Sequence, residues 1–212
     1  MEIDLNRYKN IIFDLGGVIL NIDYNLSVEA FKKLGLPNFQ EHFSQASQNH
    51  LFDLYEKGII SSDEFRMELK KHFNDSITVK DIDFAWNALL LDLPAQRLVV
   101  LENLKETHRT FLLSNTNDIH IQEFNRYLTK TAGVDDLSSY FEKLYLSYEI
   151  GMRKPDKEIF EFVLDQNDLN PAETLFIDDS KQHIESASNV GINTYWLTKG
   201  ETILDLFPLQ NA

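Results

Sequence analysis

Short apolar runs that end in polar residues recur along the chain. With the polar residues that follow them, these runs are 11–13 before Asp14, 110–113 before Ser114, 144–146 before Ser147, and 174–177 before Asp178 and Asp179. A run that is apolar throughout, rather than alternating with polar residues, is typical of a strand covered on both faces. Residues 193–197 predict a further strand.

Amphipathic helical patterns lie between these runs. They cover residues 98–104, 119–128, 157–164 and 184–190, and Gly191 closes the last of them. Strands that alternate with helices favour a parallel sheet joined by right-handed crossovers. The sequence therefore predicts an α/β fold with a Rossmann-like parallel sheet as its core.

The stretch between the first two strands is different, because it holds helical patterns and no convincing buried strand. Helices are expected over 26–34, from Ser61, where Ser61 and Glu64 have the spacing of a capping box, and from about Lys80. We interpret residues 22–91 as a helical cap inserted into an α/β core made of residues 1–21 and 92–212.

Composition narrows the class of function. The chain has 34 acidic and 20 basic residues and a formal net charge of -14, which disfavours nucleic acid as a partner. It has no cysteine, so histidines and carboxylates must carry any metal or covalent chemistry. No apolar run is long enough to span a bilayer, and no signal segment is recognisable at the start. We expect a cytoplasmic protein with a small-molecule partner and no membrane contact; the oligomeric state stays open.

Polar residues at strand ends are the candidate site. In an open parallel sheet, ligands bind beyond the carboxyl ends of the strands, and Asp14, Ser114 and the pair Asp178 and Asp179 all lie there. Each of these residues taken alone is more often a turn or cap residue. Their joint occurrence at neighbouring strand ends predicts a common site.

Carboxylates that meet at such an edge repel one another unless a hard cation lies between them, and oxygen ligands suit magnesium. Asp14 could then attack a phosphorus atom and form an aspartyl-phosphate. Ser114, the loop amides after Asp14 and Ser114, and the cation of Lys154 are candidate donors for the phosphate oxygens. Lys154 could equally be an ordinary exposed residue ahead of the helix that begins near Pro155.

These segments resemble the four motifs of the haloacid dehalogenase-like (HAD) hydrolases. The matching residues are 13–18 for the first motif, 112–115 for the second, Lys154 and Pro155 for the third, and 176–180 for the fourth. The insertion is similar to the cap of phosphatases, phosphoglucomutases and dehalogenases of this superfamily, and residues 55–61 resemble a recurring cap segment. The branch most similar in appearance is that of the bacterial sugar-phosphate phosphatases, which includes glucose-1-phosphate phosphatase.

The resemblance implies a magnesium-dependent phosphatase that acts on a small phosphate ester, with a role for each motif. Asp14 would be the nucleophile and a magnesium ligand, beside the carbonyl of Gly16 and the carboxylate of Asp179. Asp178 would assist directly or through water, while Ser114 and Lys154 would hold the phosphoryl group. The expected substrate contacts are Asn115, Gly17 and Asp23.

One position departs from the family pattern. Most phosphatases of the superfamily carry a second aspartate two residues after the nucleophile as general acid and base, and this chain has Gly16 there. Loss of such a group commonly slows a reaction by roughly a hundredfold to ten-thousandfold. Three consequences are open: a substitute acid, a slow phosphatase, or a different reaction.

Asp23 could be the substitute acid or could cap the helix near Leu26, and we favour the capping role. His183 could support the fourth motif or lie on the surface, and we favour the surface.

Two other functions remain as alternatives. A 2-haloacid dehalogenase would not need an acid in its first step, but the acidic pair Asp178 and Asp179 makes little sense beside a substrate carboxylate. A catalytically weak binding or regulatory protein on the same fold is the second alternative. Candidates for lining the cleft from the cap side are Asn21, Asp23, His50 and Trp86.

Overall fold

A five-stranded parallel sheet forms the centre of the protein. The computed structural model describes residues 4–36, 39 and 50–209. The strands are β1 (Asn10–Phe13), β2 (Arg109–Ser114), β3 (Lys143–Leu146), β4 (Thr174–Asp178) and β5 (Asn193–Trp196). They are all parallel and lie in the order β3-β2-β1-β4-β5. The predicted α/β class and parallel sheet are therefore confirmed.

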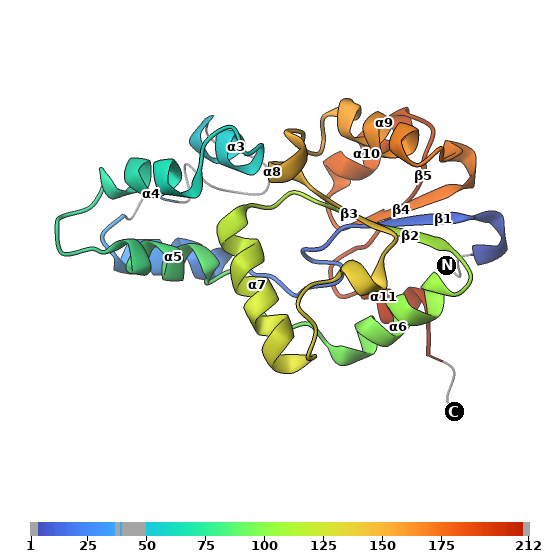
Figure 1. Ribbon diagram of the computed structural model, residues 1–212, viewed down its shortest axis with the longest axis horizontal. Helices are drawn as coiled ribbons and strands as arrows, with labels where there is room; N and C mark the ends of the chain where they lie inside the picture. The colour runs from blue at the N-terminus through green and yellow to red at the C-terminus, as the bar shows by residue number, and fades with distance from the viewer. Residues whose placement is uncertain (1–3, 37–38, 40–49, 210–212) are drawn as a thin grey trace.

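Helices cover both faces of this sheet (Figure 1). They are α6 (Ala95–Lys105), α7 (Asp118–Thr131), α8 (Ser147–Ile150), α9 (Lys157–Gln166), α10 (Lys181–Asn189) and α11 (Ile203–Leu206), with 3-10 turns at Leu5–Arg7, Ser138–Tyr140 and Pro171–Glu173. Ile11 and Phe13 pack with α6, α7 and α11, whereas Ile12 packs with α9 and α10 on the other face. Burial on both faces explains why the strand sequences are apolar throughout.

The strand order brings three of the predicted site segments together. β1 is central, and Phe13 at its end pairs with Leu112 of β2 and with Ile177 of β4. The residues that follow these positions therefore emerge side by side at the carboxyl edge of the sheet. Asp14 is the first of them, and its backbone N–H donates to the carbonyl of Ile177 at 3.0 Å.

A group of helices, which we call the helical insertion, lies beside the sheet (Figure 1). Its described residues form α1 (Tyr24–Lys33), α3 (His50–Glu56), α4 (Ser62–Lys70) and α5 (Val79–Asn87). The predicted capping box at Ser61 and Glu64 is present at the start of α4. Helix α3 was not predicted from the helical pattern.

Two extended segments join the helical insertion to the sheet. Ile22 and Leu90 form an antiparallel bridge. Around it, the Asn21 N–H donates to the Asp92 carbonyl at 3.0 Å, and the Leu91 N–H donates to the Asn21 carbonyl at 3.0 Å. These paired crossings support our division of the chain at residues 22 and 91, which remains an interpretation.

Trp86 is part of the core of the helical insertion and does not line the cleft, contrary to our expectation. Its side chain is fully buried, with ring centroids 5.4 Å from Phe52 and 5.1 Å from Phe65. The reason is helical periodicity, since Ile82 and Trp86 lie one turn apart on the inner face of α5. His50 is exposed and Asn21 bonds to Asp92, so neither lies at the cleft either.

We expect Trp86→Ala to destabilise the protein by about 3–5 kcal/mol, because it opens a large cavity among packed aromatic rings. Denaturant unfolding followed by circular dichroism measures this change. Phe84→Ala is the matched control on the same helix, since Phe84 is 77% exposed and surface substitutions usually change stability by within about 0.5 kcal/mol. Equal destabilisation by the two substitutions would contradict this account of the core.

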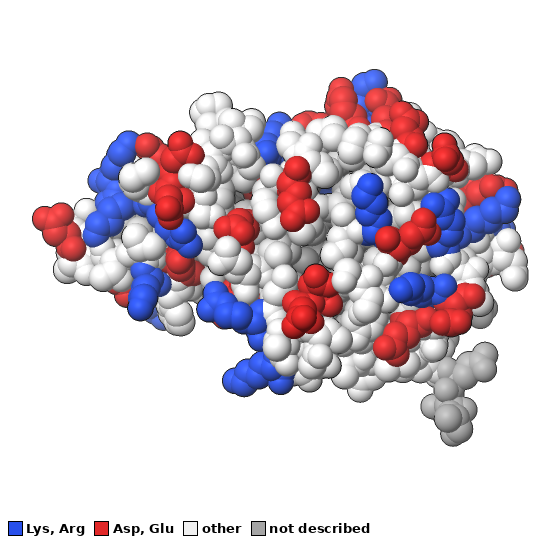
Figure 2. All heavy atoms as spheres, viewed as in Figure 1, with Lys and Arg blue, Asp and Glu red and all other residues white. Residues whose placement is uncertain are grey.

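Charged side chains of the two signs are mixed on the face drawn in Figure 2. On the face drawn in Figure 2, basic side chains stand beside acidic ones over both the sheet and the helical insertion. Among the described residues, no helix is long and apolar enough to cross a membrane.

Candidate active site

Lys154 links the ends of β1 and β4 from a completely buried position. Its Nζ lies 2.8 Å from Asp14 Oδ1 and 2.7 Å from Asp178 Oδ2, and its side chain has no exposed surface. The alternative that Lys154 is an exposed residue ahead of a helix is therefore wrong. A buried ammonium between two carboxylates places one cation directly beside the predicted nucleophile.

Asn115 holds the lysine loop in place. Its Oδ1 accepts from the Lys154 backbone N–H at 2.9 Å, and its Nδ2 donates to the Lys154 carbonyl at 2.8 Å. Next along the chain, the Ser147 hydroxyl accepts from the Thr116 N–H at 2.9 Å. We expected Asn115 to contact substrate; the structure gives its side chain a positioning role, which leaves its backbone for a substrate contact.

Asp178 is surrounded by donors. Its Oδ1 accepts from the Ser180 N–H at 2.7 Å, and its carboxylate lies 3.0 Å from His183 Nδ1 in addition to Lys154. Burial alone would raise the pKa of Asp178, but the Lys154 cation and the His183 hydrogen bond outweigh it and lower that pKa to about 2. Asp178 is thus a stable anion that anchors the lysine.

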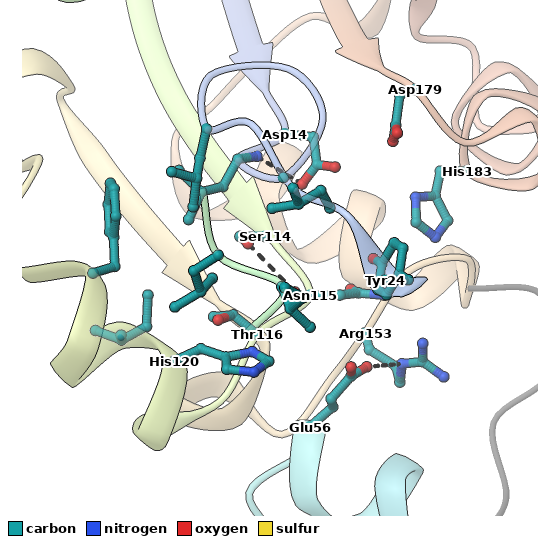
Figure 3. Close-up of a pocket in the computed structure, with 18 residues that line it drawn as sticks. Asp14, Tyr24, Glu56, Ser114, Asn115, Thr116, His120, Arg153, Asp179 and His183 are labelled. Carbon is teal, nitrogen blue, oxygen red and sulfur yellow. Dashed lines mark hydrogen bonds and ion pairs between the residues drawn. The ribbon is translucent and has the colours of Figure 1, made fainter. Parts of the chain in front are cut away.

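His183 is buried, which corrects our expectation of a surface position. It lies in the first turn of α10, and its ring faces Asp178 and the cavity (Figure 3). The sequence does not distinguish the inner from the outer side of this short helix. The direction of the His183 ring could therefore not be predicted from the sequence.

The environment of Asp14 favours a cation. Burial raises the pKa of Asp14 to about 8, Asp178 and Asp179 add to the shift, and Lys154 opposes it. Asp14, Asp178 and Asp179 each offer an oxygen, and these atoms lie within 4.8 Å of one another. An all-oxygen donor set of this kind fits a hard divalent ion such as magnesium.

Gly17 and Asp23 are not brought to the cavity. The Gly17 N–H donates to the Leu20 carbonyl at 2.8 Å, and a Cβ on Gly17, whose φ is +77°, would overlap the Asp179 carboxylate. Asp23 is the N-cap of α1, where its side chain accepts from the Asn25 N–H at 3.0 Å. Gly17 thus makes room for Asp179, and Asp23 has the capping role that we favoured.

A cavity of about 70 Å³ lies between the sheet and the helical insertion, with a different set of polar groups at each end (Figure 3). Asp14 and Asp179 lie at one end, and Glu56 and Arg153 lie at the other. Its apolar lining consists of Leu15, Leu20, Ile22, Leu89, Leu90, Ile121 and Phe124. Sequence reasoning did not identify Glu56 or Arg153, although Glu56 lies in the recurring cap segment and Arg153 precedes Lys154.

Two further polar side chains border this cavity. Burial, and then the charge of Glu56, raises the pKa of the Tyr24 phenol, so Tyr24 stays a neutral hydroxyl. His120 is also neutral, because burial lowers its pKa to about 4. Its Nε2 lies 3.1 Å from the Trp86 carbonyl and its Nδ1 lies 3.0 Å from Asn117 Nδ2, so we assign the tautomer with the proton on Nε2. With both nitrogens engaged, His120 is a structural residue.

The position of the absent general acid is filled by an apolar side chain. A Cβ built on Gly16 would lie 2.9 Å from Ile22 Cδ1. Ile22 belongs to the extended segment that enters the helical insertion. A carboxylate at residue 16 would therefore require the Ile22 side chain to move.

The fold and the site together define a class of protein, and comparison with known proteins agrees. The sequence model of the haloacid dehalogenase-like hydrolases matches residues 11–197, and the chain belongs to this family. It is 35% identical over 187 residues to a D-ribitol-5-phosphate phosphatase of Bacteroides thetaiotaomicron, a match that covers 88% of this chain and 90% of that protein.

Solved structures of relatives superpose closely. A HAD family enzyme of Bacteroides thetaiotaomicron, an aspartate-to-alanine variant in complex with magnesium and inorganic phosphate, has a TM-score of 0.86 and 39% identity over 95% of this chain and 100% of that chain. A HAD-like family hydrolase from Porphyromonas gingivalis has a TM-score of 0.85 and 32% identity over 96% and 100% of the two chains.

Proposed function

We propose that this protein is a magnesium-dependent phosphatase that releases phosphate from a small sugar or polyol phosphate through an aspartyl-phosphate on Asp14. The observation that carries the proposal is the buried Asp14 carboxylate at one end of the cavity, 2.8 Å from Lys154 Nζ and clustered with Asp178 and Asp179. Two comparisons support the proposal. One relative is named as a D-ribitol-5-phosphate phosphatase. A solved structure similar to this protein contains magnesium and inorganic phosphate.

The metal site follows from the donors present. Asp14, the carbonyl of Gly16 and Asp179 would hold the magnesium ion, with Asp178 acting through Lys154 or through water. When bound, the ion neutralises the charge that would otherwise keep an anionic phosphate away from an anionic nucleophile.

The reaction has two steps. In the first, an oxygen of Asp14 attacks phosphorus, the bond from phosphorus to the ester oxygen breaks, and that oxygen takes a proton from solvent water and leaves as the alcohol. In the second, water attacks phosphorus, the bond to Asp14 breaks, and phosphate and the free carboxylate are released. The Ser114 hydroxyl, the Asn115 backbone N–H and the Lys154 ammonium hold the phosphoryl oxygens.

Protonation of the ester oxygen is the difficult event in the first step, because the usual general acid of the family is absent. Gly16 and Ile22 leave no carboxylate where most family phosphatases have one. Esters whose alcohols leave easily, such as p-nitrophenyl phosphate or a sugar 1-phosphate, are therefore favoured as substrates for this site.

The test is phosphate release from p-nitrophenyl phosphate and a panel of sugar and polyol phosphates, after EDTA treatment and again with added magnesium. We expect release only with the metal. Asp179→Asn should raise the magnesium concentration for half-maximal activity by about 10- to 100-fold, because it removes a ligand. Asp135→Asn, at an exposed aspartate, is the matched control and should leave that concentration unchanged. Release without any divalent ion would contradict the proposal.

The same measurements separate the two alternatives. Halide release from 2-chloropropionate in the absence of magnesium would favour a dehalogenase, and binding of phosphate esters with no turnover would favour a binding protein. The cytoplasmic location stays a prediction of the sequence.

A further inference from the structure

An ion pair between Glu56 and Arg153 forms the end of the cavity remote from Asp14 (Figure 3). Glu56 ends helix α3 of the helical insertion, and Arg153 lies between α8 and α9, immediately before Lys154. Arg153 Nε lies 3.1 Å from Glu56 Oε2, and the two side chains are 13% and 10% exposed. The pair therefore faces the cavity more than it faces bulk water.

A buried ion pair is a costly feature for a cavity that apolar side chains also line. Desolvating two charges opposes folding unless good hydrogen bonds offset it, and apolar side chains of similar size often serve stability equally well. Arg153 Nε is buried and makes no well-aligned hydrogen bond, despite its short distance to Glu56. A buried donor with unused hydrogen-bonding capacity at a cavity wall indicates a ligand contact.

Other described contacts besides the Glu56–Arg153 pair fasten the helical insertion to the rest of the protein. The Tyr55 hydroxyl accepts from the Ile119 N–H at 3.2 Å, and the Ser62 hydroxyl donates to Asp118 at 2.8 Å. Lys57 pairs with Asp156 at 3.2 Å. These contacts already fasten the insertion to α7 and to the segment before α9. Fastening the insertion alone does not require the pair to lie at the cavity.

Glu56 is also poorly placed to replace the general acid that is absent at Gly16. A general acid must reach the ester oxygen within hydrogen-bonding distance, and that oxygen is bonded to the phosphorus that Asp14 attacks. Figure 3 shows Glu56 across the cavity from Asp14, with Ser114 and Asn115 between them. Glu56 thus faces the part of a bound ester that lies beyond its phosphoryl group.

We propose that Glu56 and Arg153 bind hydroxyl groups of the substrate's alcohol portion and so make the enzyme selective for polyhydroxylated phosphate esters. The carboxylate accepts the hydrogen of one hydroxyl, and the guanidinium donates to the oxygen of the same or the neighbouring hydroxyl. The phosphoryl group lies against Asp14, and the hydroxylated chain extends towards the helical insertion. This inference rests on the proposed phosphatase function and names its substrate class.

The test compares kcat/KM for ribitol 5-phosphate and for pentyl phosphate, a five-carbon ester without other hydroxyl groups. The ratio of the two values measures selectivity for hydroxyls. We expect Glu56→Gln and Arg153→Lys each to lower this ratio by about 10- to 100-fold, chiefly by raising KM for ribitol 5-phosphate. The first substitution removes the charge of the acceptor, and the second removes the planar guanidinium fork that donates to the hydroxyl. Asp53→Asn is the matched control, since Asp53 contacts Arg153 from outside the cavity at 3.2 Å. It should leave the ratio within threefold of wild type.

Other outcomes overturn the inference. If Glu56→Gln lowers kcat/KM for both esters by the same factor, Glu56 supports the fold or the chemistry and does not select the substrate. An unchanged ratio in both variants refutes the hydroxyl contact. Thermal unfolding of each variant is measured first, and Arg153→Lys decides the matter if Glu56→Gln does not fold. If the wild type hydrolyses neither these esters nor p-nitrophenyl phosphate, the proposed phosphatase function itself fails.

Discussion

Replacing Asp14 with asparagine is expected to lower the rate of phosphate release by a factor on the order of 10⁴ or more, because the amide is not a nucleophile for phosphorus. Steady-state release of phosphate from p-nitrophenyl phosphate measures the effect. Asp165→Asn, at an exposed aspartate of α9, is the control and should keep the wild-type rate. Substantial release by the Asp14 variant would refute the nucleophile.

The same variant should gain stability in metal-free buffer. The pKa of Asp14 is raised from 3.8 to about 8 by burial and acidic neighbours, so the folded protein binds a proton that the unfolded chain releases. The free energy of unfolding of the wild type therefore falls as pH rises from about 4 to 8. The asparagine variant has no carboxyl group at this position, so its free energy of unfolding does not fall for this reason. Its melting temperature should exceed that of the wild type at pH 8, with a smaller difference at pH 5. The opposite trend would show that Asp14 is stabilised as an anion without metal.

Replacement of Lys154 by methionine is expected to impair both folding and catalysis. Methionine fills the space of the alkyl chain but leaves the buried carboxylates of Asp14 and Asp178 without their cation. Breaking a buried pair in this way commonly costs about 3–5 kcal/mol. Activity should fall at least about a hundredfold, because the phosphoryl group loses a charged donor.

Denaturant unfolding and phosphate release measure these two effects. Lys157→Met is the matched control three residues away, since Lys157 is 62% exposed and pairs with Glu161 on the surface. An exposed pair contributes at most about 1 kcal/mol, so this variant should resemble the wild type. If Lys154→Met is as stable as Lys157→Met, the lysine is not the counter-ion of the buried carboxylates.

Much of the sheet could be predicted because its signal is local. Ile11, Ile12 and Phe13 are buried on both faces, and that burial is what makes the run apolar and visible in the sequence. The Ser61 capping box is equally local. Helix α3 was not predicted because the apolar pattern before Tyr55 is short and its neighbours are polar. The aromatic rings of this helix pack against Phe65 and Trp86, and that tertiary packing stabilises it.

The site divides in the same way. The positions of Asp14, Ser114 and Asp178 at one edge of the sheet could be predicted because these residues lie at strand ends, and strand ends meet by topology. Glu56 and Arg153 could not be paired, since their contact depends on how the helical insertion docks on the sheet. Trp86 was expected at the cleft, whereas the inner face of α5 buries it. The structure thus adds the contacts that depend on tertiary docking.

The paired crossings at Ile22 and Leu90 have a consequence for the evolution and engineering of the protein. Because the helical insertion leaves and re-enters the sheet at adjacent, hydrogen-bonded positions, one short junction holds both of its ends. Segments inserted between close ends are well tolerated in folded domains. Helical insertions from relatives could therefore be exchanged at this junction while the phosphate-handling residues stay in place. Arg153 would remain behind with the sheet, so a transplanted insertion needs an acidic partner where Glu56 now stands.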